Sequence, residues 1–257
     1  MINVGIDVGA ESIKVAVAND GKILALAKAA GGFDLKASTE ELIEQAFKKA
    51  GLARQEGVGM VATGGGRKSI STLTETELVE FIAAAKGAYF FSPRARVVID
   101  IGANEGRAVS LDNEGKVRDF VRNDRCAAGS GTFVEAMARA LKVTLDEFIQ
   151  LSLASTQTVP INAQCVIFAE SEVVSLIHSG YTREDIANAI HHAIAERITA
   201  MVRRLHIESD VVLIGGVANN IAFVNSLKET LKEDIVVPPE PEYVSAIGAA
   251  ISSDKGG

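Results

Sequence analysis

The sequence contains one short unit twice, and this repeat restricts the possible folds more than any other feature. Residues 6–14 read Ile-Asp-Val-Gly-Ala-Glu-Ser-Ile-Lys, and residues 99–107 read Ile-Asp-Ile-Gly-Ala-Asn-Glu-Gly-Arg. Each copy leaves an apolar, strand-like run, passes an Asp and a Gly, and enters a second β-rich run. The hairpin turn at 19–23 recurs at 113–117, with one residue inserted in the second copy. The repeat predicts a duplicated α/β chain in which each half is a mixed sheet with helices around it.

Composition limits the class of protein. The chain has 257 residues, 47% of them hydrophobic and 23% charged, which is typical of a well-packed globular protein. The formal net charge of −7 argues against nucleic acid as a partner, because general nucleic-acid binding needs a basic face. No apolar run approaches the roughly 20 residues of a membrane span, and the first residues enter a strand without a basic leader. We therefore expect no membrane partner and a cytoplasmic location.

Apolar periodicity, caps and turn residues predict the secondary structure. The predicted strands cover 2–8, 13–18, 23–30, 57–63, 97–101, 107–111, 116–121, 211–214 and 235–237. The predicted helices cover about 38–50 (capped by Ser38 or Thr39), 74–91, 132–141, a segment from Thr144, 166–178, 185–205, 219–231 and 244–252. The glycine run 64–66 before Arg67 suits either a close approach to a ligand or a flexible turn.

Each repeated unit presents backbone N–H groups and a carboxylate at the edge of its sheet. Two such units facing each other across a cleft could hold a polyphosphate and its metal ion. We expect Asp7 and Asp100 to hold Mg²⁺ through water, because Mg²⁺ keeps most of its waters. Glu105 could alternatively orient the attacking water as a general base. The remaining candidates for phosphate binding are Gly9, Ala10, Ser12, Lys14, Gly102, Ala103 and Asn104. The alternative is a duplication kept for folding alone.

A third motif follows the apolar strand at 211–214. Its glycines, Gly215 and Gly216, would let a flat adenine and its ribose lie against the backbone, and Val217 and Asn219 continue the turn. Alone, the motif would also fit any tight strand-to-helix turn. Together with the repeat, this order of motifs resembles the actin, Hsp70 and sugar-kinase superfamily.

That resemblance implies a duplicated ribonuclease H-like fold, with two lobes around a nucleotide cleft. The small-residue run at 245–250 resembles the second connecting helix of the superfamily, and that helix belongs to the first lobe. We also assign Gly248, in this run, to the nucleotide site. We therefore expect a first lobe of 1–93 plus 243–257 and a second lobe of 94–242.

The chain has two cysteines, Cys126 and Cys165, and each precedes a predicted helix. Two are too few for a disulfide scaffold, and free cysteines often simply pack in a core. The partial positive charge at a helix N-terminus, however, favours thiolate and metal ligation. The helix after Cys126 opens with Gly129 and Gly131, which we also assign to the nucleotide site. Two thiolates cannot complete a four-cysteine iron–sulfur cluster, whereas a two-fold dimer would bring four together.

Three runs, 123–133, 165–173 and 215–220, closely resemble the activator (ATPase) component of 2-hydroxyacyl-CoA dehydratases, whose relatives serve benzoyl-CoA reductases. The resemblance covers essentially the whole chain. It implies a homodimer that binds ATP or ADP with Mg²⁺ and holds one [4Fe–4S] cluster through Cys126 and Cys165 of each subunit. It also implies ATP-driven delivery of a low-potential electron to an iron–sulfur dehydratase or reductase, with ferredoxin or flavodoxin as the electron donor.

The sequence departs from this family in two motifs. The family's Asp-Ile-Gly-Gly-Gln-Asp is Asp-Ile-Gly-Ala-Asn-Glu at 100–105, which moves the polar groups by about one methylene and bears on hydrolysis rate more than on ATP binding. The family's Ala-Thr-Gly-Tyr-Gly-Arg has Gly65 in place of the tyrosine. Two rival functions stay open: a small-molecule kinase without a cluster, although no substrate-binding insertion is evident, and an ATP-gated reactivating chaperone.

Overall fold

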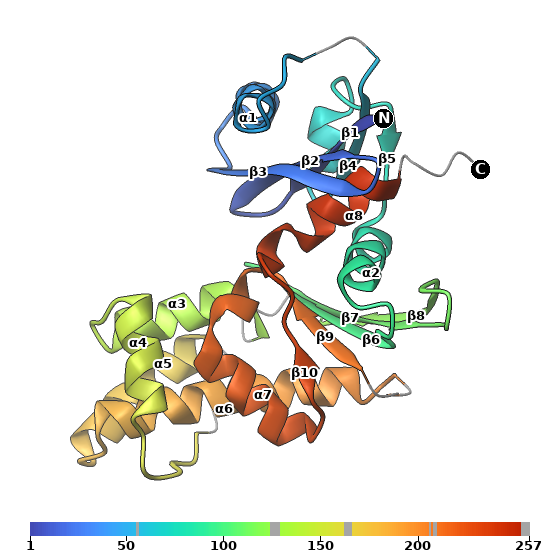
Figure 1. The fold of residues 1–257 in the computed structure, drawn as a ribbon. Helices are drawn as coiled ribbons and strands as arrows, with labels where there is room; N and C mark the ends of the chain where they lie inside the picture. Colours follow the sequence, from blue (N-terminus) through green and yellow to red (C-terminus); the bar gives the residue numbers. More distant parts are fainter. Residues whose placement is uncertain (55–56, 124–128, 162–165, 206, 208–209, 253–257) are drawn as a thin grey trace.

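The structure is a computed structural model that describes residues 1–54, 57–123, 129–161, 166–205, 207 and 210–252. Its framework is a pair of five-stranded sheets, one built by the N-terminal part of the chain and one by the following part. Two helices lie between the sheets, and the remaining helices cover their outer faces (Figure 1). The mixed α/β architecture predicted from the repeat is confirmed.

The first sheet has the strand order β3-β2-β1-β4-β5. Its strands are β1 (Ile2–Val8), β2 (Ser12–Asn19), β3 (Lys22–Ala30), β4 (Gly59–Thr63) and β5 (Thr76–Glu77). Helix α1 (Leu35–Lys49) packs its apolar side on one face, and α8 (Val244–Ser252) packs on the other (Figure 1). The C-terminal helix therefore returns to the sheet with which the chain began.

The second sheet has the equivalent order β10-β9-β6-β7-β8. Its strands are β6 (Val97–Ile101), β7 (Gly106–Leu111), β8 (Val117–Arg122), β9 (Val211–Ile214) and β10 (Ile235–Val236). Helix α2 (Glu80–Phe91) lies on one face of this sheet, although the sequence assigns it to the first lobe. Where the two lobes divide along the chain thus stays a prediction.

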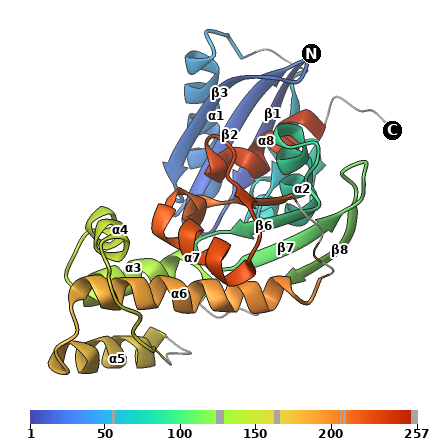
Figure 2. The ribbon, with the colours of Figure 1, turned by 60° about the horizontal axis from the view of Figure 1, so that its bottom comes forward.

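The outer face of the second sheet carries a larger helical layer. It comprises α3 (Gly131–Ala140), α4 (Leu145–Leu153), α5 (Val166–His178), α6 (Arg183–Val202) and α7 (Ile221–Leu231). Helix α6 runs along the sheet, and α5 lies outermost, beyond α6 (Figure 2). The largest apolar core joins this layer to the strands, so movements of the sheet edge and of these helices are coupled through packing.

The two helices between the sheets cross at glycines. A Cβ on Gly248 of α8 would lie 1.9 Å from the carbonyl oxygen of Ala83, and one on Gly87 of α2 would lie 2.0 Å from that of Val244. Real Cβ atoms do not approach backbone oxygen so closely, so only glycine permits this crossing. The close contact of α2 with α8 joins the two sheets at the base of the space between them.

Several predicted helix starts are wrong. Helix α1 begins at Leu35 rather than near Ser38, because Asp34 caps it by accepting a hydrogen bond of 3.0 Å from the backbone N–H of Ala37. Thr39 is instead buried inside the helix, where its hydroxyl bonds to the carbonyl of Leu35.

The predicted helix 74–91 begins only at Glu80, since Thr76–Glu77 pairs with β4 as an edge strand. The predicted helix 219–231 is divided into a 3-10 turn, η3 (Gly216–Asn219), and α7, which Asn220 caps. Helix 166–178 and strand 211–214 have the predicted bounds.

Candidate functional site

The two repeated units adopt the same backbone structure. In the first, the N–H of Gly9 donates to the carbonyl of Ser12 over 3.0 Å, and in the second, that of Gly102 donates to Glu105 over 3.0 Å. Each bond closes the turn between two neighbouring antiparallel strands, β1 and β2 in the first copy and β6 and β7 in the second. The repeat seen in the sequence is therefore a repeat in structure, with one copy at the centre of each sheet.

The register of the strands places an acidic residue opposite a basic one in both copies. Asp7 on β1 pairs with Lys14 on β2, and Asp100 on β6 pairs with Arg107 on β7. The side chains follow this register: Lys14 Nζ lies 3.8 Å from Asp7 Oδ2, and Arg107 Nε lies 3.7 Å from Asp100 Oδ2. Both pairs face the space between the sheets.

One cavity of about 1360 Å³ lies between the sheets and brings most of the predicted site residues together. Its wall includes Asp7, Gly9, Ala10, Ser12, Lys14, Asp100, Gly102, Ala103, Asn104, Glu105, Gly131, Gly215, Gly216, Val217 and Asn219. Gly129 and Gly248 are not part of this wall. Gly129 lies behind Gly106, and Gly248 is at the crossing of α8 with α2, which gives it a packing reason to be glycine.

The surroundings of Asp7 raise its pKa. Burial raises the pKa of Asp7, the charges of Asp100 and Glu80 raise it further, and Lys14 acts against them. A divalent cation near Asp7 and Asp100 would remove this repulsion, and carboxylate oxygens are ligands that Mg²⁺ accepts. Among the described residues, no group of three or more His, Cys, Asp or Glu side chains is arranged to ligate a metal directly. The carboxylates of Asp7 and Asp100 are chemically suited to Mg²⁺, and its binding through water stays a prediction.

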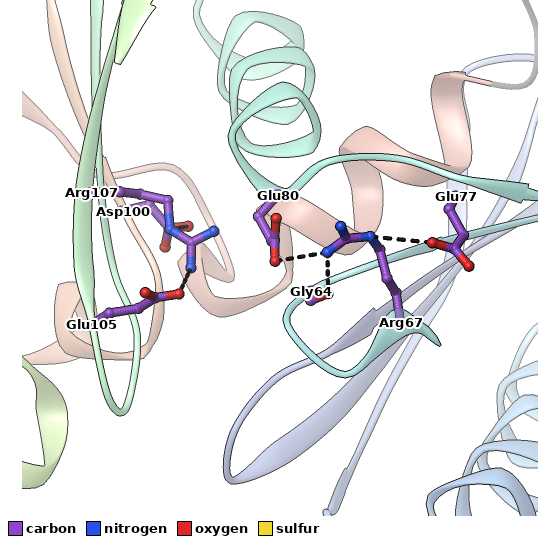
Figure 3. Close-up of polar contacts among 7 residues, drawn as sticks. All are labelled: Gly64, Arg67, Glu77, Glu80, Asp100, Glu105 and Arg107. Atoms are coloured by element: carbon purple, nitrogen blue, oxygen red, sulfur yellow. Dashed lines mark hydrogen bonds and ion pairs between the residues drawn. The ribbon is translucent and has the colours of Figure 1, made fainter. Parts of the chain in front are cut away.

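Arg107 is a site residue that sequence reasoning did not assign. Its Nη2 donates to Glu105 Oε1 over 2.9 Å, while its Nε faces Asp100 (Figure 3). Burial opposes the charge of Arg107, but Asp100, Glu105 and Glu80 together raise its pKa. The signal was present in the repeat, because Arg107 occupies the position of Lys14.

The glycine turn at 64–66 is held in place by a second arginine. Arg67 Nη1 donates to the carbonyl of Gly64 over 3.0 Å and to Glu80 Oε1 over 2.9 Å (Figure 3). Gly64 has a φ of +89°, and a Cβ there would lie 2.4 Å from the carbonyl oxygen of Val8. The turn is therefore packed against the end of β1, and Gly65, with nothing within 4 Å of its Cβ position, opens to the cavity.

The glycine motif after β9 forms part of the cavity wall. Gly215 has a φ of +91°, and its N–H donates to the carbonyl of Pro241 over 2.9 Å. Next to it, Lys28 Nζ of β3 lies 2.5 Å from Glu242 Oε2, in the 3-10 turn η4 (Pro241–Tyr243). A flat ring can lie against Gly216, where no atom is within 4 Å of the Cβ position.

Both cysteines lie outside the described residues. The described chain resumes at Gly129 after Cys126 and at Val166, the first residue of α5, after Cys165. The role of Cys126 and Cys165 as cluster ligands therefore stays a prediction. As for membranes, none of the helices in the described ranges is both long and apolar enough to cross a bilayer.

Known proteins are similar to this chain over nearly its whole length. Residues 4–253 match the model of the BadF/BadG/BcrA/BcrD ATPase family. The activator of lactoyl-CoA dehydratase from Anaerotignum propionicum is 39% identical over 251 residues, which cover 98% of this chain and 96% of that protein.

Solved structures extend the match to three dimensions. The crystal structure of component A of (R)-2-hydroxyglutaryl-CoA dehydratase from Acidaminococcus fermentans has a TM-score of 0.93 at 34% identity and covers 98% of this chain and 97% of its own. The activator of 2-hydroxyisocaproyl-CoA dehydratase from Clostridium difficile, solved with bound ADPNP, has a TM-score of 0.91 at 34% identity over 98% and 94% of the two chains.

A more distant neighbour identifies the wider fold. A ROK-family glucokinase from Streptomyces griseus superposes with a TM-score of 0.64 at 15% identity over the full length of both chains, and at this identity it supports the fold alone. The predicted actin, Hsp70 and sugar-kinase fold is confirmed. With its repeated acid–base strand pairs around one cavity, the chain belongs to the BadF/BadG/BcrA/BcrD ATPase family.

Proposed function

We propose that this protein hydrolyses ATP to deliver a low-potential electron to a 2-hydroxyacyl-CoA dehydratase-type or acyl-CoA reductase-type partner. The observation that carries the ATP part is the pair of acid–base units, Asp7 with Lys14 and Asp100 with Arg107, in one register on two sheets that share a cavity. The dehydratase activator from Anaerotignum propionicum supports the type of partner.

In the proposed site, Asp7 and Asp100 bind the waters of Mg²⁺, and Mg²⁺ supplies charge neutralisation on the phosphates. The N–H groups of the two repeated turns and Lys14 bind phosphate oxygens. The base and ribose lie against the wall at 215–219. Glu105, at the edge of the second turn with its side chain 36% exposed, orients the attacking water and accepts its proton.

The redox part of the proposal rests on the cysteines. Cys126 and Cys165 from two subunits are proposed to hold one [4Fe–4S] cluster, which supplies single-electron transfer at low potential. Their positions in the sequence, shortly before α3 and directly before α5, favour ligation by thiolates. In this proposal ferredoxin or flavodoxin reduces the cluster in the cytoplasm.

We propose that nucleotide binding affects the cluster by changing the angle between the two lobes. The first lobe is 1–93 plus 243–257, and the second is 94–242. The two sheets meet at the glycine crossing of α2 and α8, a natural place for a change of angle. Helix α6 packs on the second sheet, and α3 and α5, the helices that follow the cysteines, both contact α6. Such a change would therefore reach α3 and α5. ATP would thus shift the population between states that expose the cluster differently.

The test is anaerobic purification followed by iron analysis, EPR, sedimentation and ATPase measurement. We expect a dimer with four irons, and ATPase activity that is lost with a Mg²⁺ chelator and restored by Mg²⁺. Cys126→Ser should lose the cluster and keep nucleotide binding, which separates the two parts of the proposal. An iron-free wild-type protein after reconstitution, or a normal cluster in Cys126→Ser, would overturn the redox part and leave a kinase or a chaperone.

A further inference from the structure

The guanidinium of Arg107 lies in the wall of the cavity, among several carboxylates. It contacts Glu105 over 2.9 Å and Asp100 over 3.7 Å, and its side chain is 17% exposed. Glu80, at the start of α2, faces it from the opposite side of the cavity floor, where Arg67 holds the Glu80 carboxylate over 2.9 Å (Figure 3). One cation is therefore surrounded by carboxylates from β6, the β6–β7 turn and α2.

The bond from Arg107 to Glu105 conflicts with the proposed role of Glu105 as the base that activates water. Glu105 can accept a proton from water only through a carboxylate oxygen that is free, and the charge-assisted bond from the Arg107 guanidinium occupies Oε1. The partner of that bond, Arg107, lies in the same cavity floor where the proposed function places phosphate oxygens. A bound triphosphate would thus compete with Glu105 for the same guanidinium.

We propose that Arg107 is a phosphate-sensing residue that blocks Glu105 when no nucleotide is bound, and that moves to the terminal phosphate of a nucleoside triphosphate. This inference rests on the proposed ATPase function and adds a residue and an order of events to it. Transfer of the guanidinium does two things at once: it frees Glu105 as the base and places a fork of donors on the phosphate that reacts. Without a terminal phosphate, Glu105 stays paired.

The oxygen of water forms a bond to the terminal phosphorus while Glu105 takes one proton from that water. The bond between the same phosphorus and the oxygen that bridges it to ADP breaks, and the electron pair stays on ADP. Arg107 stabilises the charge on the departing phosphoryl group. The products are ADP and phosphate, and Glu105 returns its proton to solvent.

The first repeated unit shows why this role belongs to Arg107 and not to Lys14. Within the described ranges, the one ion pair of Lys14 is with Asp7, at 3.8 Å, and the position equivalent to Glu105 is Ser12, which has no charge to be blocked. A lysine is a point charge, whereas the arginine fork addresses two carboxylates through different nitrogens. The asymmetry between the copies thus assigns the switch to the second copy.

The experiment measures binding of ADP and of ADPNP by calorimetry, together with kcat and KM for ATP. The variants are Arg107→Gln, Arg107→Lys, Glu105→Gln and the double variant Arg107→Gln/Glu105→Gln. The matched control is Glu114→Gln on the exposed β7–β8 turn, where Glu114 also pairs with a basic residue, Lys116, over 2.7 Å. Thermal unfolding of every variant shows whether it is folded before it is compared.

Arg107→Gln should lower kcat about 100-fold or more and reduce the preference for ADPNP over ADP about tenfold. Glu105→Gln should also lower kcat, yet it should tighten ADPNP binding several-fold, because Arg107 is then released to the phosphate. In the double variant this tightening should disappear. Arg107→Lys should recover part of the ADPNP preference and little of kcat.

Two results would overturn the inference. One is an unchanged ADPNP preference in Arg107→Gln, and the other is equal tightening by Glu105→Gln with and without Arg107, which would be a simple charge effect. Both are read against a wild-type protein that hydrolyses ATP. A wild-type protein without ATPase activity would instead contradict the proposed function itself.

Discussion

The side-chain amide of Asn220, at the start of α7, lies 2.9 Å from Nε2 of His191 on α6. Both residues are buried. The other ring nitrogen, Nδ1, lies 2.8 Å from the carbonyl of Ala187, which can only accept, so Nδ1 carries the proton and Nε2 accepts from Asn220. The Asn220 oxygen in turn accepts from the N–H of Phe223 over 3.0 Å. These hydrogen bonds connect α6 to the segment at 215–220, which lines the cavity. They require a neutral imidazole.

The neutral His191 predicts a loss of stability in mild acid. Burial lowers the pKa of His191 from 6.5 to about 4. The unfolded chain therefore takes up a proton first, and the stabilisation is complete above pH 6.5 and declines as the pH falls towards 4. Between pH 7.5 and 5 we expect the free energy of unfolding to fall by about 2 kcal/mol from this group. Urea denaturation at both values measures it.

The neighbouring histidine is the control for this pH dependence. His192 is on the surface, where Nε2 lies 2.9 Å from Glu229. His192→Gln should keep most of the loss at pH 5, whereas His191→Gln should remove it. An equal loss in both variants would assign the acid sensitivity to other groups.

Asn220→Ala should destabilise the protein without touching the Asp–Gly units. It removes the cap of α7 and leaves Nε2 of His191 buried without its donor. The two effects together should cost about 2–3 kcal/mol, which urea denaturation at pH 7.5 will show. Asn219→Ala, one residue earlier and exposed, should have almost no effect on stability. Equal costs at both positions would contradict the importance of the buried bond.

Gly248→Ala should separate the two central helices. The new methyl group would be 1.9 Å from a backbone oxygen of α2, and a backbone cannot rotate away as a side chain can. We expect a loss of about 3 kcal/mol or more in the free energy of unfolding, measured by urea denaturation. Gly65→Ala provides the comparison, since nothing lies within 4 Å of its Cβ position. Similar losses in the two variants would mean that the helices at the crossing can move apart at little cost.

Asp7→Asn should make the protein more stable and less active. Because the pKa of Asp7 is raised by burial and by neighbouring carboxylates, the folded state holds its proton more strongly than the unfolded state. Stability from this group is therefore lost as the pH rises through its pKa, and at neutral pH the charge opposes folding. A neutral amide should raise the Tm by about 2–4 °C, which calorimetry measures. Mg²⁺-dependent ATPase activity should fall at least 100-fold; a variant with normal activity would exclude Asp7 from metal binding.

The sequence predicted the duplicated core correctly because the repeat is local and complete. Each copy contains the strand, turn and strand that determine the register. The amino-acid sequence alone was therefore enough to place Asp7 and Asp100 near the ends of equivalent central strands. The same alignment would have identified Arg107, had the basic residue of the first copy been carried over to the second.

Where the sequence failed, the deciding interaction was nonlocal or had close competitors. The predicted caps of α1 were Ser38 and Thr39, but Asp34 caps the helix and Thr39 is buried within it. The start of α2 depended on the pairing of Thr76–Glu77 with β4, a contact that no local pattern reveals. The contact of Gly248 with α2 is likewise nonlocal, and the assignment of Gly248 to the nucleotide site stays a prediction.

The hydroxyl of Ser12 and the carboxylate of Glu105 occupy matching places in the two turns. The two turns therefore present different chemistry to a bound molecule, a neutral hydroxyl at one and a carboxylate at the other. In the proposed function the base that activates water, Glu105, belongs to the second turn. The attacking water and the terminal phosphate would then be held on that side of the cavity, so that only one end of the substrate can react.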